Sequence, residues 1–504
     1  MDWLTLKSGS DVRGTAVGEG IVLTADIAKA LGIAFVLKLA REQHRDPAQL
    51  TVALGRDSRI SGPDLLRAAA EGIAAAGATA LDFGICTTPA MFMSTITPGY
   101  EANGAVMITA SHHPWNKNGL KFFTCKGGLE GKEISEMLVE AQSLNMQTYE
   151  AKGRIEQKPF LPVYMDQLAS RIRIGLQTQD KRPLEGLHVV VDAGNGAGGF
   201  YADLMEQLGA RTDGSQFLDP DGYFPNHIPN PENPDAMKSL QNAVLKSGAD
   251  LGVIFDADCD RAAIVDADGK EINRNRLIAL ISAILLVQES GQTIVTDSVT
   301  SSGLTAFIES HGGIHYRFKR GYRNVIDEAI RLNSVGEKCP LAIETSGHAA
   351  LRENHFLDDG MYLVTVLIVQ AMQMKKQGRK LGSLINDLKE PVESTEIRLS
   401  ITEPDFKSAG EAVIQKVLEY AESDSDWHIA PDNREGVRIS FDLGGIQDAG
   451  WFLLRLSVHD PVLPLNAESD TNGGIHEILT RLYRLIASCP GIDFSQLIRA
   501  TENP

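Results

Sequence analysis

The hydrophobic and polar positions follow the same order in three separate stretches of the chain. Each stretch has a short β-branched run, a turn with an aspartate and small residues, an alanine- or leucine-rich segment that predicts a helix, and then a glycine. The stretches begin at Leu50, Leu187 and Gln292. A strand, a turn and a helix in series predict α/β units with largely parallel strands. The aspartates in equivalent places are Asp57, Asp192 and Asp297. This repetition predicts three related α/β domains.

The last hundred residues have a different pattern. The segments 392–401, 436–444 and 451–458 are typical of strands of an antiparallel sheet. Two helices are predicted beside them, at 405–421 and 473–487. This region therefore predicts a separate α+β domain.

A chain of 504 residues is longer than one hydrophobic core usually serves. We expect an α/β fold with four domains, three of them related α/β domains with mixed sheets and the last a C-terminal α+β domain. Their expected limits are 1–155, 156–265, 266–385 and 386–504. Linkers are expected near 145–160, 262–275 and 375–392.

The composition narrows the function classes. A formal net charge of -18 disfavours nucleic acid or an anionic membrane as a partner, so an anionic ligand needs a local basic cluster. The five cysteines are far apart and odd in number, which favours reduced thiols in a cytoplasmic protein. The first residues lack a signal-peptide pattern. The apolar runs at 277–287 and 361–369 are too short to span a bilayer and predict buried helices.

A serine loop is the first candidate for chemistry. Residues 104–123 read GAVMITASHHPWNKNGLKFF, in which a buried strand leads into a turn of small residues that would expose the Ser111 hydroxyl. His112, His113 and Lys121 can donate hydrogen bonds to an anion there.

An acidic cluster is the second candidate. Residues 251–261 read LGVIFDADCDR, and alternation along a strand would place Asp256, Asp258 and Asp260 on one side. Three carboxylates repel one another unless a cation binds them, and oxygen ligands suit Mg²⁺. Arg261 follows at once and can hold an anion beside the metal.

Three further segments carry weaker signals. ETSGH at 344–348 can bind a diol, and WFLLRLSVHDP at 451–461 can bind a phosphate at the end of a strand. GNGAGG at 194–199 matches the dinucleotide fingerprint, with Asp213 about 20 residues further on. A purely structural turn explains this last segment equally well.

Together these motifs resemble the α-D-phosphohexomutase superfamily, and most closely its phosphomannomutase/phosphoglucomutase branch. The matching segments are DVRGT at 11–15, GRDSR at 55–59, CTTPA at 86–90, TASHHP at 109–114, DGYFPNHIPNPENP at 221–234, DADCDR at 256–261, KRGYRN at 319–324 and ETSGH at 344–348. The resemblance covers nearly the whole chain in the right order. It implies four domains around a central cleft.

The resemblance also implies a reaction. A phosphoserine at Ser111 gives its phosphate to a hexose phosphate, and the resulting sugar bisphosphate turns around and returns its other phosphate to the serine. One Mg²⁺ per chain would bind Ser111, Asp256, Asp258 and Asp260. Hexose 1,6-bisphosphate is the implied activator. The other implied partner is a phosphosugar substrate, and the chain is expected to be a monomer or a small homo-oligomer.

The implied site residues fall into two groups. Catalytic roles are implied for Ser111, Arg13, Lys121, Arg261 and His348. Substrate-binding roles are implied for His112, Lys319, Arg320, Glu344, Ser346, His348, Arg455, Ser457 and His459.

The chain departs from the family pattern in three loops. His113 stands where asparagine is more common, and Tyr322 replaces a histidine. In the fourth domain RLSVHDP replaces the usual phosphate loop, so that Val458 and His459 stand where a small residue and a threonine are usual.

Other functions stay open at this point. They are a phosphoglucosamine mutase, a non-catalytic sugar-phosphate sensor, and a phosphatase of the haloacid dehalogenase type with Asp256 as nucleophile.

Overall fold

The computed structural model describes residues 1–149, 152–457 and 460–502. The chain forms two compact units. One comprises Met1–Asn273 and Ser346–Ser383, and the other comprises Arg274–Thr345 and Leu384–Pro504.

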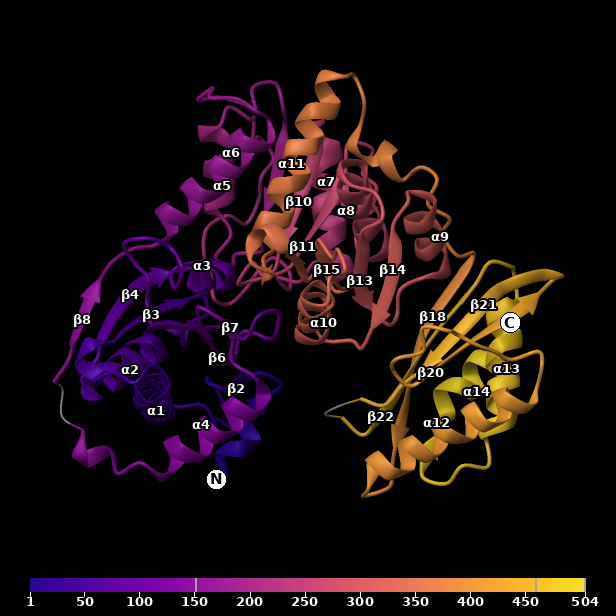
Figure 1. The fold of residues 1–504 in the computed structure, drawn as a ribbon, viewed down its shortest axis with the longest axis horizontal. Coiled ribbons are helices and arrows are strands. Elements are labelled where there is room, and N and C mark those ends of the chain that lie inside the picture. Colours follow the sequence, from indigo (N-terminus) through magenta and orange to yellow (C-terminus); the bar gives the residue numbers. More distant parts are fainter. Residues whose placement is uncertain (150–151, 458–459, 503–504) are drawn as a thin grey trace. The chain divides into compact units, whose positions relative to one another are not determined.

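The first unit begins with a mixed sheet (Figure 1). Its strands run in the order β1-β2-β6-β5-β3-β4-β8, with β7 beside β6. The strands β5, β3, β4 and β8 are parallel neighbours, whereas β1, β2, β6 and β5 pair antiparallel. The bounds are β1 Lys7–Ser8, β2 Asp11–Thr15, β3 Thr51–Arg56, β4 Thr79–Ile85, β5 Gly104–Ile108, β6 Lys117–Thr124, β7 Gly127–Gly128 and β8 Arg154–Gln157.

Helices that pack with this sheet are α1 Ala25–Gln43, α2 Gly62–Ala75, α3 Thr88–Met93 and α4 Gly131–Ser143. The helices α1 and α2 cross at two glycines. A Cβ at Gly72 would lie 2.0 Å from the carbonyl oxygen of Lys29, and one at Gly32 would lie 2.4 Å from that of Ala69. The two backbones approach this closely only because both positions lack a side chain.

A second sheet completes the first unit. Its strand order is β12-β11-β10-β9, and the bounds are β9 Val189–Asp192, β10 Leu251–Phe255, β11 Ala262–Asp266 and β12 Glu271–Ile272. The helices of this part are α5 Leu161–Gly175, α6 Phe200–Gln207, α7 Pro234–Ser247 and α11 Gly360–Lys376, and the short strands β16 Ala349–Leu351 and β17 Leu357–Asp358 pair antiparallel. The linker expected near 262–275 is wrong in its first part, because 262–266 is the buried strand β11, paired with β10.

The second unit contains three parallel strands and an antiparallel sheet. In the first group, β13 Thr293–Asp297 lies between β14 Ile314–Phe318 and β15 Leu341–Ile343. Its helices are α8 Arg274–Gln288, α9 Ser302–Ser310 and α10 Tyr322–Ser334. The apolar runs at 277–287 and 361–369 lie in α8 and α11, so the prediction of two helices is confirmed.

The antiparallel sheet has the order β19-β20-β21-β22-β18-β23. Its bounds are β18 Glu393–Ile401, β19 His428–Ile429, β20 Val437–Leu443, β21 Ile446–Leu454, β22 Val462–Ser469 and β23 Ile492–Asp493, and its helices are α12 Phe406–Ser423, α13 Gly474–Ile486 and α14 Ser495–Glu502. The α+β prediction is confirmed, but the strand expected at 451–458 is displaced to 446–454.

Short 3₁₀ helices lie elsewhere in the chain. Their bounds are η1 Trp3–Leu6, η2 Pro47–Gln49, η3 Met146–Thr148, η4 Arg352–Asn354 and η5 Leu381–Ile385.

The three repeated stretches are strand–turn–helix units, in which β3, β9 and β13 lead towards α2, α6 and α9. Their equivalent aspartates, Asp57, Asp192 and Asp297, are fully buried at or just after the strand ends.

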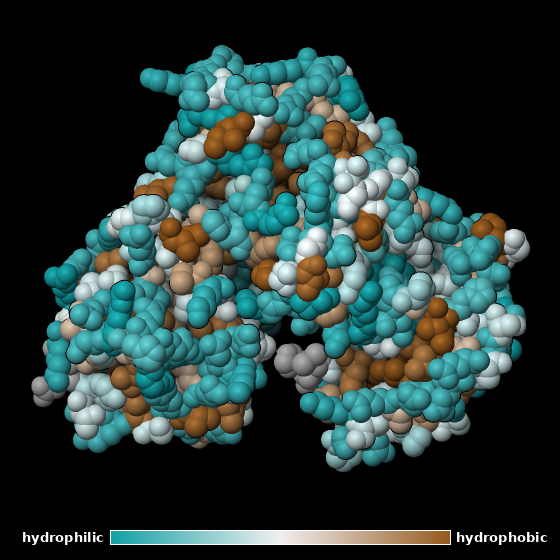
Figure 2. Space-filling model, viewed as in Figure 1, coloured by the Kyte–Doolittle hydropathy of each residue, from teal (hydrophilic) through white to brown (hydrophobic). Residues whose placement is uncertain are grey.

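Among the described residues, no helix combines the length and the apolar character needed to cross a bilayer. The face visible in Figure 2 is mostly hydrophilic, with separate groups of hydrophobic residues.

The glycine crossing yields a stability prediction. We expect Gly72→Ala to lower the free energy of unfolding by about 1–3 kcal/mol, because its Cβ must displace the backbone of α1. Chemical denaturation followed by circular dichroism measures the change. Glu71→Ala, on the exposed side of α2, is the matched control and should change stability by less than about 0.5 kcal/mol. A Gly72→Ala protein as stable as this control would contradict the prediction.

Candidate active site

Ser111 lies three residues beyond the end of β5, in a turn with a left-handed backbone at φ 52°. Its backbone N–H donates to Thr109 Oγ1 at 2.8 Å. Its hydroxyl donates to Asp256 Oδ2 at 2.9 Å and accepts from Arg261 Nη2 at 3.1 Å. Ser111 is only 3 % exposed, so the expectation of an exposed hydroxyl is wrong. The acidic loop covers it.

The three aspartates of the acidic loop follow β10 in a turn. The expectation that they alternate along a strand is wrong, because β10 ends at Phe255 and the chain turns back to β11 through Cys259 at φ 66°. The turn still gathers Asp256, Asp258 and Asp260. One carboxylate oxygen from each lies within 4.8 Å of the others, and all three residues are buried.

Cationic side chains surround these carboxylates. Lys121 Nζ lies 2.5 Å from Asp260 Oδ2 and 3.2 Å from Asp258 Oδ2. Arg261 reaches Asp256 Oδ2 through Nε and Nη2, at 3.1 and 3.0 Å. Burial opposes the charge of Arg13, but Asp11, to which Arg13 donates at 2.8 Å, raises its pKa, and Asp258 and Asp260 raise it further.

The pKa values reflect this crowding. Burial raises the pKa of Asp256 well above its usual value, and the charges of Asp260 and Asp258 raise it further. Burial also opposes ionisation of Asp260, but the charges of Lys121, His348 and Arg261 together outweigh burial and lower that pKa. The pKa values of these two carboxyl groups, which lie in one turn, are therefore shifted in opposite directions.

A divalent cation fits this cluster. Asp258 Oδ1 and Asp260 Oδ1 are buried and accept no hydrogen bond from the described part of the chain. Buried carboxylate oxygens without a donor are costly unless a cation binds them. Carboxylate oxygens are also the ligands that Mg²⁺ prefers. The residues that could hold the ion are Asp256, Asp258 and Asp260, with Ser111 beside them.

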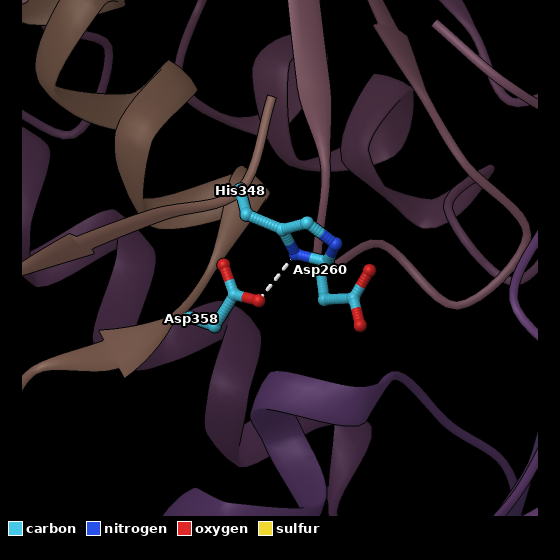
Figure 3. Close-up of side chains that lie close together, drawn as sticks. All are labelled: Asp260, His348 and Asp358. Atoms are coloured by element: carbon cyan, nitrogen blue, oxygen red, sulfur yellow. Dashed lines mark hydrogen bonds and ion pairs between the residues drawn. The ribbon is translucent and has the colours of Figure 1, made fainter. Parts of the chain in front are cut away.

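A histidine–aspartate pair adjoins the acidic cluster. His348 Nδ1 contacts Asp358 Oδ2, and Figure 3 shows the ring flanked by Asp358 and Asp260. Burial opposes the charge, but these two carboxylates raise the pKa of His348 to about 9. An isolated antiparallel bridge between Arg261 and His348 joins the two loops. No motif in the sequence pointed to Asp358, because it lies ten residues from the histidine that it holds.

His112 and His113 stack at a ring-centroid distance of 4.9 Å beside the serine. Burial and the nearby cations lower the pKa of His112 to about 2 and that of His113 to about 4. His112 Nδ1 lies 3.3 Å from Ser111 Oγ. Near neutral pH both rings are therefore uncharged hydrogen-bonding groups.

GNGAGG is a packed structural turn. Residues 194–198 are buried, and a Cβ at Gly196 would lie 2.7 Å from Cα of Ala257 in the acidic loop. Asn195 Nδ2 donates to the carbonyl of Asp219 at 2.9 Å. These glycines bring the turn against the acidic loop, which favours the structural interpretation over dinucleotide binding.

The second unit brings together its own set of predicted residues. Glu344 Oε1 accepts from the N–H of Gly321 at 2.6 Å, directly beside Arg320 in the KRGYRN loop. Arg320 N–H donates to Glu435 Oε2 at 3.1 Å, and its Nε lies 4.0 Å from Asp297 Oδ2. Sequence reasoning missed Glu435, which follows a polar loop with no recognisable motif. Lys319 is exposed.

Arg455 and Ser457 follow β21. Burial lowers the pKa of Arg455, opposed by the charge of Glu435 and assisted by that of Arg320, so these groups share one electrostatic environment. Arg455 Nε is buried and donates to none of the described residues. Ser457 Oγ accepts from the N–H of Asp460 at 3.2 Å. The expected contact residue His459 lies outside the described residues.

Comparisons with known proteins agree with this geometry. Family models described as phosphoglucomutase/phosphomannomutase, alpha/beta/alpha domains I, II and III, match residues 5–149, 162–269 and 273–392. A phosphoglucomutase of Neisseria gonorrhoeae is 29 % identical over 483 residues, covering 95 % of this chain and 96 % of the relative. A phosphomannomutase/phosphoglucomutase of Pseudomonas aeruginosa is 30 % identical over 475 residues, covering 93 % of each.

A solved structure is also similar. The crystal structure of a phosphoglucomutase/phosphomannomutase family protein from Burkholderia thailandensis has a TM-score of 0.79 and 27 % identity, covering 98 % of this chain and 99 % of that one.

The acidic cluster yields a prediction of cation binding. We expect Asp258→Asn to weaken binding of Mg²⁺ or Mn²⁺ at least tenfold in isothermal titration, because it removes a charge from a buried oxygen ligand set. Asp213→Asn, on an exposed ion pair of the same unit, is the control and should bind as the wild type does. Equal affinity of both variants would place the cation elsewhere.

Proposed function

We propose that this chain, which belongs to the phosphoglucomutase/phosphomannomutase family, is a phosphohexomutase that moves a phosphate between the 1 and 6 positions of a hexose. One observation carries the proposal. The Ser111 hydroxyl is buried between a carboxylate of the acidic cluster and the guanidinium of Arg261. A serine in this setting is suited to carry a phosphoryl group, whose charge needs cations and a bound metal.

The proposed cycle begins with phosphoserine at Ser111. The substrate hydroxyl attacks its phosphorus, the bond from phosphorus to Ser111 Oγ breaks, and a new sugar phosphate bond forms. The hydroxyl proton passes to a basic group of the site, and Ser111 Oγ takes up a proton as it leaves. The sugar bisphosphate then turns around, and Ser111 Oγ gives up its proton to the site and attacks the other phosphorus. The bond from that phosphorus to the sugar oxygen breaks, the sugar oxygen takes up a proton, and the phosphoserine is restored as the isomeric monophosphate is released. Hexose 1,6-bisphosphate would activate the enzyme by phosphorylating a free Ser111.

The chain's own residues supply charge and proton carriers. Arg261 donates to Ser111 Oγ and so lies where the transferred phosphate is attached. Arg13 adds a second guanidinium near the acidic loop. Lys121 and the His348–Asp358 pair are the groups we assign to proton transfer at the reacting oxygen. One Mg²⁺, when bound by the three aspartates, would neutralise phosphate charge and polarise the phosphoryl group.

The second unit supplies groups suited to binding a sugar phosphate. We assign the sugar hydroxyls to Glu344, aided by Ser346 of the first unit. We assign the non-reacting phosphate to Arg455 and Ser457, with Lys319 and Arg320. The support is the electrostatic grouping of Arg455, Arg320 and Glu435 and the buried Nε of Arg455. Arginine binds phosphate oxygens in a bidentate manner.

We further propose that mannose and glucose phosphates are the preferred substrates and that the protein is cytoplasmic. We also propose four domains with limits at 1–155, 156–265, 266–385 and 386–504. The family-model matches at 5–149, 162–269 and 273–392 support the first three domains. The phosphatase alternative is disfavoured, because both oxygens of Asp256 already accept hydrogen bonds.

A coupled assay of the purified protein on mannose, glucose and glucosamine phosphates tests the proposal. Conversion of mannose or glucose 1-phosphate to the 6-phosphate is the expected result. Turnover of glucosamine phosphate alone would make the chain a phosphoglucosamine mutase. Binding without turnover of any of the three would make it a sugar-phosphate sensor.

Ser111 gives a direct prediction. Intact-mass analysis of the wild type should find a fraction heavier by one phosphoryl group, and Ser111→Ala should lack it. We expect Ser111→Ala to lose at least about 10³-fold in kcat with glucose 1,6-bisphosphate present, because the phosphate has no other carrier. Full turnover by Ser111→Ala would refute the assignment.

Arg455 gives a prediction about substrate binding. Arg455→Ala should raise KM about tenfold or more, because a charge-assisted bond to phosphate is lost. Arg398→Ala, in an exposed ion pair of the same antiparallel sheet, is the matched control and should leave KM unchanged. Equal KM values for the two variants would remove Arg455 from the phosphate site.

A further inference from the structure

Arg59 is a fully buried arginine beneath the serine loop, with 0 % of its surface exposed. Its Nε donates to Asp57 Oδ2 at 3.0 Å. The four N–H groups of Nη1 and Nη2 match four backbone carbonyls of the loop. Nη1 donates to Pro114 and Lys117 at 2.7 and 2.9 Å, and Nη2 donates to Ser111 and His113 at 2.5 and 2.6 Å.

This arrangement uses all five donors of the guanidinium. A buried charge is normally held by counter-charges, yet four of the five acceptors here are carbonyls of one loop. Those carbonyls belong to residues 111–117, which include the reacting serine. The side chain therefore acts as the internal scaffold of a loop with little regular secondary structure of its own.

Asp57 extends the scaffold to the reacting residue itself. Its Oδ2 accepts from Thr109 Oγ1 at 2.7 Å, and Thr109 Oγ1 accepts from the N–H of Ser111 at 2.8 Å. Asp57 also accepts from the N–H of Arg59 at 2.9 Å, which holds the ion pair in one geometry. The chain of bonds Arg59–Asp57–Thr109–Ser111 fixes both the carbonyl and the N–H of the serine.

The loop at residues 222–224, from the part of the unit that contains the second sheet, packs against Arg59 and the serine loop. The Phe224 ring centroid lies 5.2 Å from the Arg59 guanidinium carbon. A Cβ at Gly222 would lie 2.4 Å from the N of Ile60, so the backbones touch. Trp115 of the serine loop packs against Tyr223 with ring centroids 5.5 Å apart.

We infer that Arg59 is a positioning residue for phosphoryl transfer, which holds the Ser111 loop in its reactive geometry through four carbonyls and the Asp57–Thr109 relay. The inference rests on the proposed mutase function. Arg59 acts through the loop backbone. It differs from a residue that only stabilises the fold, because its loss should loosen residues 109–117 more than the rest of the domain.

Arg59→Lys is the first test. Lysine keeps the charge but has three donors in place of five and no planar fork, so several carbonyls lose their partner. We expect kcat to fall about 100-fold while KM changes less than threefold, since a small misplacement of a reacting group has that effect. Hydrogen exchange should accelerate at the amides of residues 109–117 and stay unchanged in α1. Arg67→Lys, in an exposed ion pair on α2, is the matched control.

A second pair of variants serves if Arg59→Lys does not fold. Thr109→Val is nearly isosteric and cuts the relay, whereas Thr109→Ser keeps the hydroxyl. We expect the valine variant to lose at least tenfold in kcat with faster exchange in 109–117, and the serine variant to restore both.

The inference is overturned if Arg59→Lys keeps kcat within threefold, or if exchange accelerates equally in α1 and in the loop. For the Thr109 pair, equal kcat of Val and Ser variants overturns it. Failure of the proposed function can be told apart from failure of this inference. If the wild type has no mutase activity, a comparison of hydrogen exchange between the wild type and Arg59→Lys still shows whether Arg59 orders the loop.

Discussion

The structure depends on concentrating opposite charges in a buried space at the ends of β5 and β10. Asp256 and Arg261 contact the Ser111 hydroxyl, and Asp258, Asp260 and Lys121 complete a buried cluster in which each charge would be costly in isolation. Removing one member leaves an uncompensated charge, so the cluster is stable only as a set. The same electrostatic environment suits a phosphoryl group, since a dry site with fixed charges stabilises charge more strongly than water does. The buried Asp258 Oδ1 and Asp260 Oδ1 accept no hydrogen bond from the described residues, and they are the oxygens to which a cation could bind.

The three repeated aspartates explain how one fold plan supports different functional loops. Asp57 accepts from Thr109 and Arg59 beneath the serine loop. Asp192 contacts His227 Nε2 at 3.0 Å and so holds the proline- and asparagine-rich loop. Asp297 accepts from Thr345 Oγ1 at 2.7 Å beside the ETSGH segment. In each case a buried carboxylate at or just after the end of a parallel strand anchors a loop that arrives from elsewhere in the chain. The repetition visible in the sequence is therefore a repetition of loop anchors.

Contiguous motifs were enough to predict which residues lie together and which elements form. Ser111 and the three aspartates lie in one cluster, and the strand–turn–helix repeats are present, because short-range pattern specifies them. Sequence reasoning failed where tertiary contacts determine the backbone geometry or the burial of a residue. The aspartates gather through a turn instead of a strand, and Ser111 is buried because the distant acidic loop covers it. Asp358 and Glu435 carry no motif, and the carbonyls bound by Arg59 lie 52 to 58 positions away. Bonds at that separation leave no periodic signal in a single sequence.

The central claim is that phosphate passes between Ser111 and a sugar and not to water. The most direct measurement follows the conversion of glucose 1-phosphate, primed with glucose 1,6-bisphosphate, in water enriched in oxygen-18. Mass analysis of the products decides the result. The account predicts glucose 6-phosphate whose phosphoryl group carries no solvent oxygen and a negligible yield of inorganic phosphate. Release of inorganic phosphate carrying one oxygen-18, at a rate comparable to sugar phosphate formation, would contradict it.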